Sequence, residues 1–536
     1  KVFKYQVKKY IFLPIIAAFL FIIYFANKEH KPKLVVFIVL DQATPDIINK
    51  YDHLFTGGLR WIIDHGINFN STYHEHGHTV TGPGYYSLGS GLYPGSGGVI
   101  ANTWFDRDID RNWYCVEDTL SYELSDSTTG RSYKNINNTA LGDWVINAYP
   151  NSKIVSMSGK DRGAVLLGGK TAEIALWDDR NGGYTTSSYY SLSLPDWVTR
   201  FNQNMNVDTY FDSTWNRILP EEIYKNNTRA DNYRGENSWS SNDPILPLQF
   251  DEFKLRFINS SFYATPYGDR SLLNLGLEAV KFYKMGLDNE PDILFLGPSA
   301  IDGIGHSFGP YSHEQLDNYL RLDKALGNFI NNLEGEIGEN NTLYLLTSDH
   351  GVSELPEYLI SKGLDAGRIP RVQRDSLFSI AMNQIDLQIG AGKVNRYSNN
   401  FYFNKNLSSN KRKIATDLLK SYLIKIPGIK AVMSKKEIIN GDNSDISIRL
   451  KNMIHDTKSP DIFLIPKKYW ITSTSGTTHG SPYDYDTHIP LIFAAGDTKS
   501  EIRNDYIRSV DIAPTLARIL NINYPQDIDG KPFLIK

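Results

Sequence analysis

Carboxylate, imidazole and hydroxyl side chains recur at well-separated points of this chain, each beside turn-forming residues and next to an apolar run. The set is Asp41, Thr81, Asp302, His306, Asp349, His350 and His488. Carboxylates and imidazoles are ligands that zinc accepts, and two zinc ions a few ångströms apart can hold both the attacking and the leaving oxygen of a phosphoryl transfer. The pattern predicts a two-zinc hydrolase site in which the hydroxyl of Thr81 attacks.

Thr81 stands in a sequence that suits this role. A threonine hydroxyl is a poor nucleophile at neutral pH, but coordination to Zn²⁺ stabilises its alkoxide form, so no histidine base is required. The residues that follow, Gly82-Pro83-Gly84, permit a tight turn from a strand into a helix. Thr81 is therefore expected at a helix N-terminus, where backbone N–H groups would face a bound phosphate.

Three further polar residues indicate how the phosphoryl group is held. Lys160 and Arg162 are two positions apart, so in an extended segment both side chains project from one face, with Asp161 on the other. An arginine fork and a lysine ammonium suit the charged non-bridging oxygens of a phosphate monoester. Asn102 would donate an amide hydrogen bond to another phosphoryl oxygen. The alternative for the lysine and arginine is a surface turn with a salt bridge.

Length and composition set the frame for this site. The chain has 536 residues, of which 41% are hydrophobic and 22% are charged, which is typical of a globular protein. The formal net charge of -4 provides no basic field for nucleic acid, so the expected partners are small phosphate esters. Cys115 is the only cysteine, which excludes an intrachain disulfide. We expect a monomer.

The first 32 residues predict export. Lysines at positions 1, 4, 8 and 9 precede an uncharged, mostly apolar run over residues 10–26, and a second charged cluster follows it. This arrangement is typical of a secretory signal peptide or an uncleaved signal anchor, and an ordinary buried helix is the alternative. Because no A-x-A cleavage pattern follows, a single-helix anchor in the inner membrane is favoured, with the remainder of the chain in a bacterial periplasm.

The remainder of the chain alternates strand-like and helix-like segments. The apolar runs are Leu34–Leu40, Lys153–Met157, Asp292–Leu296 and Thr342–Thr347. Apolar residues recur at helical spacing in Ser271–Met285 and Ser312–Leu333. Continuous apolar strands joined by helices predict an α/β fold with a doubly wound, mostly parallel sheet sandwiched by helices.

The candidate ligands fall where such a fold places a site. Asp41, Asp302 and the pair Asp349-His350 each come shortly after a strand-like run, and sites in open α/β sheets form at the carboxyl ends of strands. Residues 33–536 are therefore expected to form one catalytic domain. Its stretches near 106–134, 175–262 and 356–469 look irregular and are rich in Asn, Ser, Tyr and Trp, so we expect them to cap the site.

Taken together, the motifs resemble those of the alkaline phosphatase superfamily. The matching segments are VLDQATPD, TVTGPGYYSLGSGLYPGSGGVIANTWFD, SGKDRGA, IDGIGHSFGP, TSDHG and HGSPYDYDTHIPL. They are most similar to the periplasmic PafA-type alkaline phosphatases, which are related to the nucleotide pyrophosphatase/phosphodiesterases. The resemblance extends over most of the chain from about residue 33 and implies the same doubly wound α/β sandwich.

The resemblance also implies an assignment of the site residues. One zinc would be held by Asp302, His306 and His488. The other would be held by Asp41, Asp349 and His350, with Thr81. PafA-like enzymes are similar in carrying the trio Asn102, Lys160 and Arg162 around the phosphate.

Tyr85 and His479 lie in family-like segments but are not part of that assignment. Tyr85 stands where the family segment usually carries a histidine, and this difference is expected to alter the activity or the mouth of the pocket. His479, in TTHGSPY, also lies in a family-like segment, but it is interpreted as a supporting residue because the set of zinc ligands is already filled.

The prediction for function is zinc-dependent hydrolysis of phosphate monoesters through a covalent phosphothreonine intermediate, with release of inorganic phosphate. The main alternative is a phosphodiesterase or nucleotide pyrophosphatase of the same superfamily. Lys160 and Arg162 favour the monoesterase, because a diester carries a bulky substituent where they would bind. A phosphoglycerate mutase-like or phosphoethanolamine transferase relative and an inactive binding protein on this scaffold are the remaining alternatives.

Overall fold

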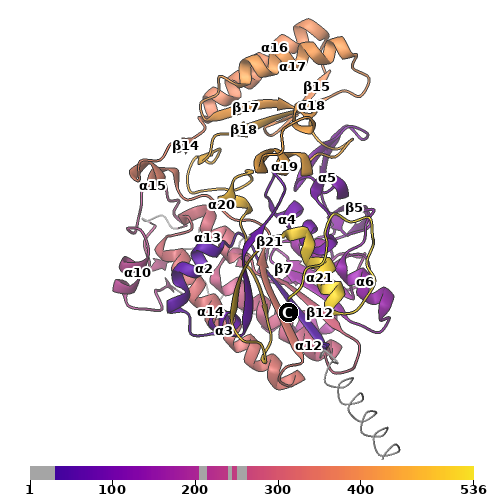
Figure 1. Ribbon diagram of the computed structural model, residues 1–536, viewed down its shortest axis with the longest axis vertical. Helices are drawn as coiled ribbons and strands as arrows, with labels where there is room; N and C mark the ends of the chain where they lie inside the picture. Colours follow the sequence, from indigo (N-terminus) through magenta and orange to yellow (C-terminus); the bar gives the residue numbers. More distant parts are fainter. Residues whose placement is uncertain (1–30, 205–213, 240–243, 250–261, 536) are drawn as a thin grey trace, which may run out of the picture.

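The computed structural model describes residues 31–204, 214–239, 244–249 and 262–535. The apolar run over residues 10–26, predicted to be a signal or anchor, lies outside the described residues. Within the described ranges, no helix is long and apolar enough to cross a membrane. Figure 1 shows a large body with a smaller lobe at one end of the molecule.

A nine-stranded sheet forms the centre of the body, in the order β21-β2-β20-β13-β1-β12-β7-β8-β9. Its strands are β1 (Leu34–Leu40), β2 (Gly66–Tyr73), β7 (Ile154–Ser158), β8 (Ile174–Asp178), β9 (Tyr184–Thr185), β12 (Asp292–Gly297), β13 (Thr342–Ser348), β20 (Leu491–Ala494) and β21 (Glu501–Arg508). The five central strands, from β13 to β8, are parallel, and β20 and β9 pair antiparallel with their neighbours. The four predicted strands are confirmed to within two residues at their ends.

Helices cover both faces of this sheet. In β1, Val36 and Ile38 face one hydrophobic core, while Val35 and Phe37 face the other. The first core is closed by α2 (Pro45–Tyr51), α3 (Gly58–Asp64), α12 (Pro266–Tyr283) and α14 (His313–Ile337). The second is closed by α4 (Thr81–Ser90), α6 (Leu141–Ala148), α7 (Asp161–Gly168) and α21 (Ile512–Ile519). The predicted helical-layer α/β sandwich is confirmed, and helices α12 and α14 match the two predicted crossover helices.

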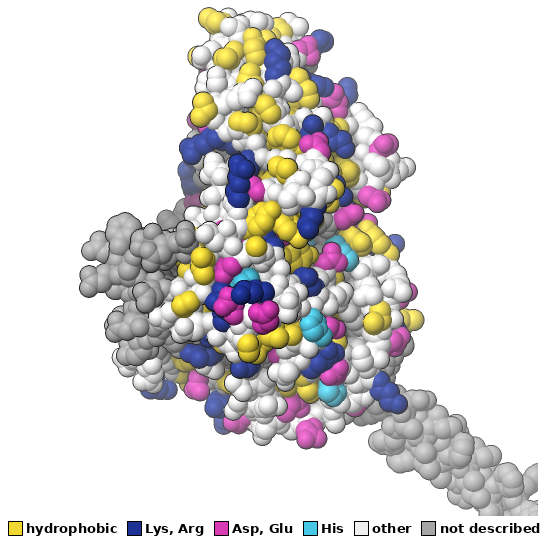
Figure 2. Space-filling model, turned by 90° about the vertical axis from the view of Figure 1, so that its left-hand side faces the viewer, with side chains coloured by type: hydrophobic (Ala, Val, Ile, Leu, Met, Phe, Trp, Pro, Cys, Tyr) yellow, Lys and Arg dark blue, Asp and Glu magenta, His cyan; other side chains and the backbone are white. Residues whose placement is uncertain are grey.

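The smaller lobe stands above the body in Figures 1 and 2. It is formed by α16 (Arg371–Ile389), α17 (Ser409–Leu423) and a four-stranded sheet in the order β15-β16-β18-β17. These strands are β15 (Val394–Tyr397), β16 (Asn400–Phe403), β17 (Ile429–Ser434) and β18 (Ile462–Pro466). On the face shown in Figure 2, basic and acidic side chains are interspersed over lobe and body.

The prediction that residues 356–469 are irregular was wrong, because this stretch has its own core, which includes Phe378, Ile385, Phe401 and Leu419. The polar outer faces of its helices dilute the apolar pattern. The stretch 106–134 contains two hairpins, β3 (Thr103–Asp106) with β4 (Arg111–Tyr114) and β5 (Glu117–Tyr122) with β6 (Thr129–Arg131).

The body brings the N-terminus of α4 directly against the end of β13. A Cβ atom added to Gly84 would lie 2.1 Å from the carbonyl oxygen of Asp349. Glycine is therefore required at this point for the helix to approach the backbone of the next predicted ligand. The close approach connects Thr81, at the start of α4, with the loop after β13.

Substitution Gly84→Ala is expected to lower the free energy of unfolding by about 1–3 kcal/mol, because the added methyl group overlaps backbone atoms. The measurement is urea unfolding, with hydrolytic activity measured in parallel, and we expect the activity to fall as Asp349 is displaced. Gly335→Ala, on the exposed side of α14, is the control, since a Cβ there meets nothing within 4 Å. That change should stabilise the protein by about 0.5–1 kcal/mol. Equal effects of the two changes would contradict the packing argument.

Candidate active site

The predicted acidic ligands come together at the carboxyl ends of three adjacent strands. Asp41 follows β1, Asp302 lies in α13 (Ala300–Phe308) after β12, and Asp349 with His350 follows β13. All four residues are buried. Since β1 lies between the other two strands, the sheet itself brings the carboxylates to one edge, as predicted for a doubly wound fold.

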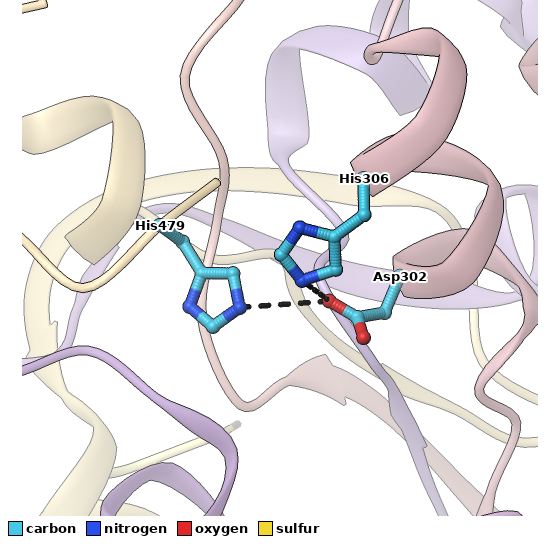
Figure 3. A group of neighbouring side chains, drawn as sticks. All are labelled: Asp302, His306 and His479. Atoms are coloured by element: carbon cyan, nitrogen blue, oxygen red, sulfur yellow. Dashed lines mark ion pairs between the residues drawn. The ribbon is translucent and has the colours of Figure 1, made fainter. Parts of the chain in front are cut away.

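Two groups of potential metal ligands occur among the described residues, and within each group the ligand atoms lie within 4.8 Å of one another. One group is Asp302, His306 and His479, drawn in Figure 3, and the other is Asp41, Asp302 and His350. Asp302 belongs to both groups. Its carboxylate therefore lies between two places where a cation could be held.

Helix α13 places Asp302 and His306 on one face, since they are four residues apart. The Nε2 atom of His306 lies 3.1 Å from Oδ1 of Asp302. Asp269 fixes the start of the helix, because its Oδ1 accepts hydrogen bonds from the N–H groups of Ser299 (2.8 Å) and Ala300 (3.1 Å). The geometry of this pair is thus set by the helix and its cap.

The third member of that group is His479, and the prediction that placed His488 there differs from the structure. The Nε2 atom of His479 lies 3.6 Å from Oδ1 of Asp302, and its ring stacks on that of His350 at 3.6 Å between centroids. His488 instead approaches the carbonyl oxygen of Asn70 with its Nε2 (2.7 Å) and stacks on Tyr73. It belongs to the strand region beside β2, outside both ligand groups.

The loop that carries His479 is locked onto α13 by backbone contacts. Gly476 has a φ of +58°, and a Cβ there would lie 1.8 Å from the carbonyl oxygen of His306. Next to it, the N–H of Thr477 donates to that same carbonyl oxygen at 3.0 Å. The sequence signal for this arrangement is the glycine on each side of the segment TTH in SGTTHG. His479 is thus a member of the ligand group, and its interpretation as a supporting residue was wrong.

The three imidazoles share one hydrogen-bonding pattern. The Nδ1 atom of His306 lies 2.9 Å from the carbonyl oxygen of Thr477, that of His479 lies 2.7 Å from Thr79, and that of His350 lies 3.1 Å from Gly351. Each Nδ1 can donate its proton to a backbone oxygen. The Nε2 atom, on the side of the carboxylates, is then the ring nitrogen that could bind a metal ion. Such contacts fix the tautomer of histidine ligands.

The charges of these groups fit ligation. Burial lowers the pKa of His479 and lowers that of His350 well below its ordinary value, so both rings are neutral at pH 7. Burial opposes ionisation of Asp302, but His306 and Lys160 beside it hold the pKa of this carboxyl well below its usual range. Burial and the nearby Asp41 raise the pKa of Asp349 well above its usual value. Uncompensated carboxylates are costly here, and a cation would relieve that cost.

Some buried atoms of Asp41, His350 and the neighbouring Asp349 have no hydrogen-bond partner. They are Oδ1 of Asp41, Oδ2 of Asp349 and Nε2 of His350. The Nε2 atom of His350 lies 3.6 Å from the first of these and 3.4 Å from the second. Three acceptors converging without a donor are what a bound cation requires, and carboxylate and imidazole donors are types that zinc prefers. The residues present therefore fit a metal pair.

Thr81 is the first residue of α4, as predicted, and its hydroxyl group lies beside the guanidinium group of Arg162. The Nη2 atom of Arg162 lies 3.3 Å from Oγ1 of Thr81. The N–H of Gly82 donates to Oδ1 of Asn102 at 2.6 Å, which fixes that amide and leaves Nδ2 as its available donor. The structure thus brings Thr81, Asn102 and Arg162 together at the helix N-terminus.

Lys160 and Arg162 do not act as one extended pair, so that expectation was wrong. Helix α7 begins at Asp161, and Lys160 precedes it as the N-cap residue. The Nζ atom of Lys160 lies 2.6 Å from Oδ2 of Asp41 and 2.6 Å from Oδ2 of Asp302. Burial by itself lowers the pKa of the lysine, but the two carboxylates outweigh burial and raise it. Lys160 therefore stays charged and joins the two ligand groups.

Arg162 is held from the opposite side by residues that the sequence reasoning did not single out. Its Nη1 atom lies 3.3 Å from the hydroxyl oxygen of Tyr114, which donates to Oδ1 of Asp161 at 2.5 Å. Arg131 also binds Asp161, with Nε 2.8 Å from Oδ2. These contacts come from the hairpins of residues 103–131, so that part of the predicted cap orients the arginine.

Tyr85, at the position where the family segment usually carries a histidine, lies in the core; its effect on activity stays a prediction. Its side chain is fully buried, and its hydroxyl donates to the carbonyl oxygen of Val39 at 3.3 Å. Space for the ring is provided by glycines, since a Cβ on Gly297 would lie 2.7 Å from the hydroxyl oxygen and one on Gly163 would lie 3.2 Å from the ring. Tyr85 therefore packs under the site as part of the core.

Comparison with known proteins gives concordant results. The family model described as type I phosphodiesterase / nucleotide pyrophosphatase matches residues 35–488. The chain is 34% identical to alkaline phosphatase PhoV of Synechococcus elongatus, over 95% of this chain and 93% of that protein. It is 31% identical to alkaline phosphatase PafA of Elizabethkingia meningoseptica, over 94% of each chain. The crystal structure of wild-type PafA superposes with a TM-score of 0.86 at 29% identity, covering 95% of this chain and 99% of that one.

Substitutions at His479 and His488 test which of the two histidines binds metal. We expect His479→Ala to lower both the content of bound metal and the rate of hydrolysis at least tenfold, because one of three ligands in its group is lost. His488→Gln should leave metal content and rate within about twofold, since an amide can still donate to the Asn70 carbonyl group. The measurements are elemental analysis of purified protein and initial rates with an aryl phosphate. A metal loss confined to the His488 variant would restore the earlier assignment.

Proposed function

Because the chain belongs to the type I phosphodiesterase / nucleotide pyrophosphatase family, we propose that it hydrolyses phosphate monoesters with two zinc ions and a phosphothreonine intermediate at Thr81. The protein is an alkaline phosphatase, an enzyme that hydrolyses phosphate esters. The zinc ions, the intermediate and the preference for monoesters are the parts that we propose.

The observation that carries the proposal is the position of Thr81. Its hydroxyl stands at the N-terminus of α4, 3.3 Å from Arg162, and α4 packs through Gly84 against Asp349. A nucleophile, a phosphate-binding cation and a set of metal ligands therefore meet at one point. This is the constellation that phosphoryl transfer requires, because most of its catalysis comes from positioning and charge stabilisation.

We assign the metal ligands from the two groups, with Asp349 in place of Asp302 in the second. Asp302, His306 and His479 would hold one zinc ion, and Asp41, Asp349 and His350 would hold the other beside Thr81. When bound, the two ions supply the positive charge that makes the threonine hydroxyl acidic and that offsets the charge of the departing ester oxygen.

The reaction then proceeds in two displacements at phosphorus. Oγ1 of Thr81 loses its proton to solvent and forms a bond to the phosphorus atom while the bond to the ester oxygen breaks, and the departing alcohol receives a proton from solvent. Water next attacks the phosphothreonine, releases inorganic phosphate and restores the hydroxyl. During both steps Arg162 holds a non-bridging oxygen, and Nδ2 of Asn102 donates to another.

Charge argues for a monoester substrate. A monoester dianion has two negative charges on its non-bridging oxygens, whereas a diester has one and carries a second substituent. Arg162 is partly buried and its surroundings keep it cationic, since Tyr114 and Asp161 offset the effect of burial and raise its pKa. A partly desolvated guanidinium of this kind favours the more highly charged ester.

Diester hydrolysis is the second candidate function, because the matching family model is named for phosphodiesterases and nucleotide pyrophosphatases.

We also propose that the protein is exported to the bacterial periplasm, on the basis of the charged and apolar pattern of residues 1–32.

Replacing the nucleophile tests the mechanism. Thr81→Ala should reduce turnover at least a thousandfold, while Thr81→Ser should retain roughly a tenth or more of it, because serine keeps the attacking oxygen. Rapid acid quench with ³²P-labelled substrate should trap phosphate on Thr81, located by peptide mapping. An alanine variant with wild-type turnover, or label on another residue, would exclude this intermediate.

Substrate choice is tested at Arg162. We expect Arg162→Ala to lower kcat/KM about 10- to 100-fold for an aryl phosphate monoester, the loss of one charge-assisted contact, and less for the methyl aryl diester. Tyr114→Phe is a milder companion variant, because it removes one hydroxyl contact and leaves the guanidinium in place. The quantity measured is the ratio of monoester to diester kcat/KM. Equal losses on both esters would favour the phosphodiesterase.

A further inference from the structure

Gln42 has an unusual position for a glutamine. It follows Asp41 directly, its side chain is fully buried, and its backbone has a φ of +74°. A left-handed conformation is uncommon for a residue with a side chain of this size and persists where surrounding contacts hold it. The contacts of Gln42 are therefore expected to hold this conformation.

Gln42 contacts both of the other carboxylates of the candidate metal pair. Its backbone N–H donates to Oδ1 of Asp349 at 3.1 Å, and its side-chain Nε2 donates to Oδ1 of Asp302 at 2.7 Å. Asp41 is its neighbour along the chain. One residue thus connects the three carboxylates that come from three different strands.

The oxygen that Gln42 contacts on Asp302 is the one that faces the imidazoles. Oδ1 lies 3.1 Å from Nε2 of His306 and 3.6 Å from Nε2 of His479. The other oxygen, Oδ2, lies 2.6 Å from Nζ of Lys160. The carboxylate is therefore held at both ends, and the amide of Gln42 determines how Oδ1 points toward the two rings.

The glycine pattern of residues 302–306 makes room for this contact. A Cβ atom on Gly305 would lie 1.9 Å from Oε1 of Gln42, so no other residue fits at that position while the glutamine keeps its place. The loop after β1 and helix α13 are thus fitted to each other through Gln42.

We propose that Gln42 is a positioning residue that sets the spacing of the two metal sites by orienting Asp302 and Asp349 relative to Asp41. The inference rests on the proposed function, since it assumes that these carboxylates hold metal ions. The role requires a neutral donor. A glutamate would place a third negative group against Asp302, and a methionine would fill the space without donating.

The test is the affinity of metal-free protein for Zn²⁺, measured by competition with a chromophoric chelator. We expect Gln42→Met to weaken binding about 10- to 100-fold, the usual cost of removing a hydrogen-bond partner of a metal ligand, and Gln42→Glu to weaken it further.

Gln315 provides a matched control. It is also a fully buried glutamine, its Nε2 would lie 3.1 Å from the same added Cβ on Gly305, and it donates to the backbone oxygen of Ile301 at 2.8 Å. Gln315→Met removes a buried amide donor without touching a carboxylate ligand, so zinc affinity should stay at the wild-type value. Gln42→Asn tests the side chain where Gln42→Met fails to fold, because asparagine tolerates a positive φ but is too short to reach Asp302.

The outcomes are distinct. Weaker zinc binding in the Gln42 variants and unchanged binding in Gln315→Met would support the proposal. Wild-type zinc affinity in Gln42→Met or Gln42→Asn would overturn it, as would an equal loss in Gln315→Met. A wild-type protein that binds no zinc would instead refute the metal part of the proposed function, and the proposal for Gln42 with it.

Discussion

The organisation of this protein depends on three carboxylates that are buried at one edge of a sheet. Asp41, Asp302 and Asp349 follow adjacent strands, so the parallel sheet that forms the core also forces them together. Two unit charges about 4 Å apart repel by roughly 4 kcal/mol at the effective dielectric of a protein. Positive or hydrogen-bonding partners are therefore a condition of folding as well as of catalysis here.

The partners come from every element that reaches this edge. Lys160, at the start of α7, spans Asp41 and Asp302, while Gln42 contacts Asp302 and Asp349. His350 and His479 remain neutral, because burial lowers their pKa values. All three imidazoles point Nε2 inward, since their Nδ1 atoms lie against backbone oxygens. Oδ1 of Asp41, Oδ2 of Asp349 and Nε2 of His350 have no hydrogen-bond partner. A divalent ion bound by these three acceptors would complete the charge balance.

Much of this could be predicted from the sequence. A carboxylate at the end of an apolar strand has a defined place in an α/β fold, so Asp41, Asp302 and Asp349 could be located before any coordinates. His306 follows from helical spacing. The choice between His479 and His488 could not be made in this way, because both lie in irregular segments far along the chain and only the contact of Gly476 with α13 decides it.

The roles of single side chains were harder to predict for the same reason. Gln42 carries no sequence signal of its own, since its function comes from a left-handed backbone and from contacts more than 250 positions away along the chain. Likewise, the separate partners of Lys160 and Arg162 depend on a helix that begins between them. Long-range contacts of this kind are determined by packing and leave no local pattern.

The division between Lys160 and Arg162 follows from the chemistry of the two cations. An ammonium is a compact charge with three donors, so Lys160 can bind two carboxylate oxygens at once. A guanidinium is a planar fork that is held well by neighbours in its own plane, and Arg162 is so held by Tyr114 while reaching Thr81. Exchanging the two residue types would leave the carboxylates without a compact bridge and Thr81 without a rigid cation.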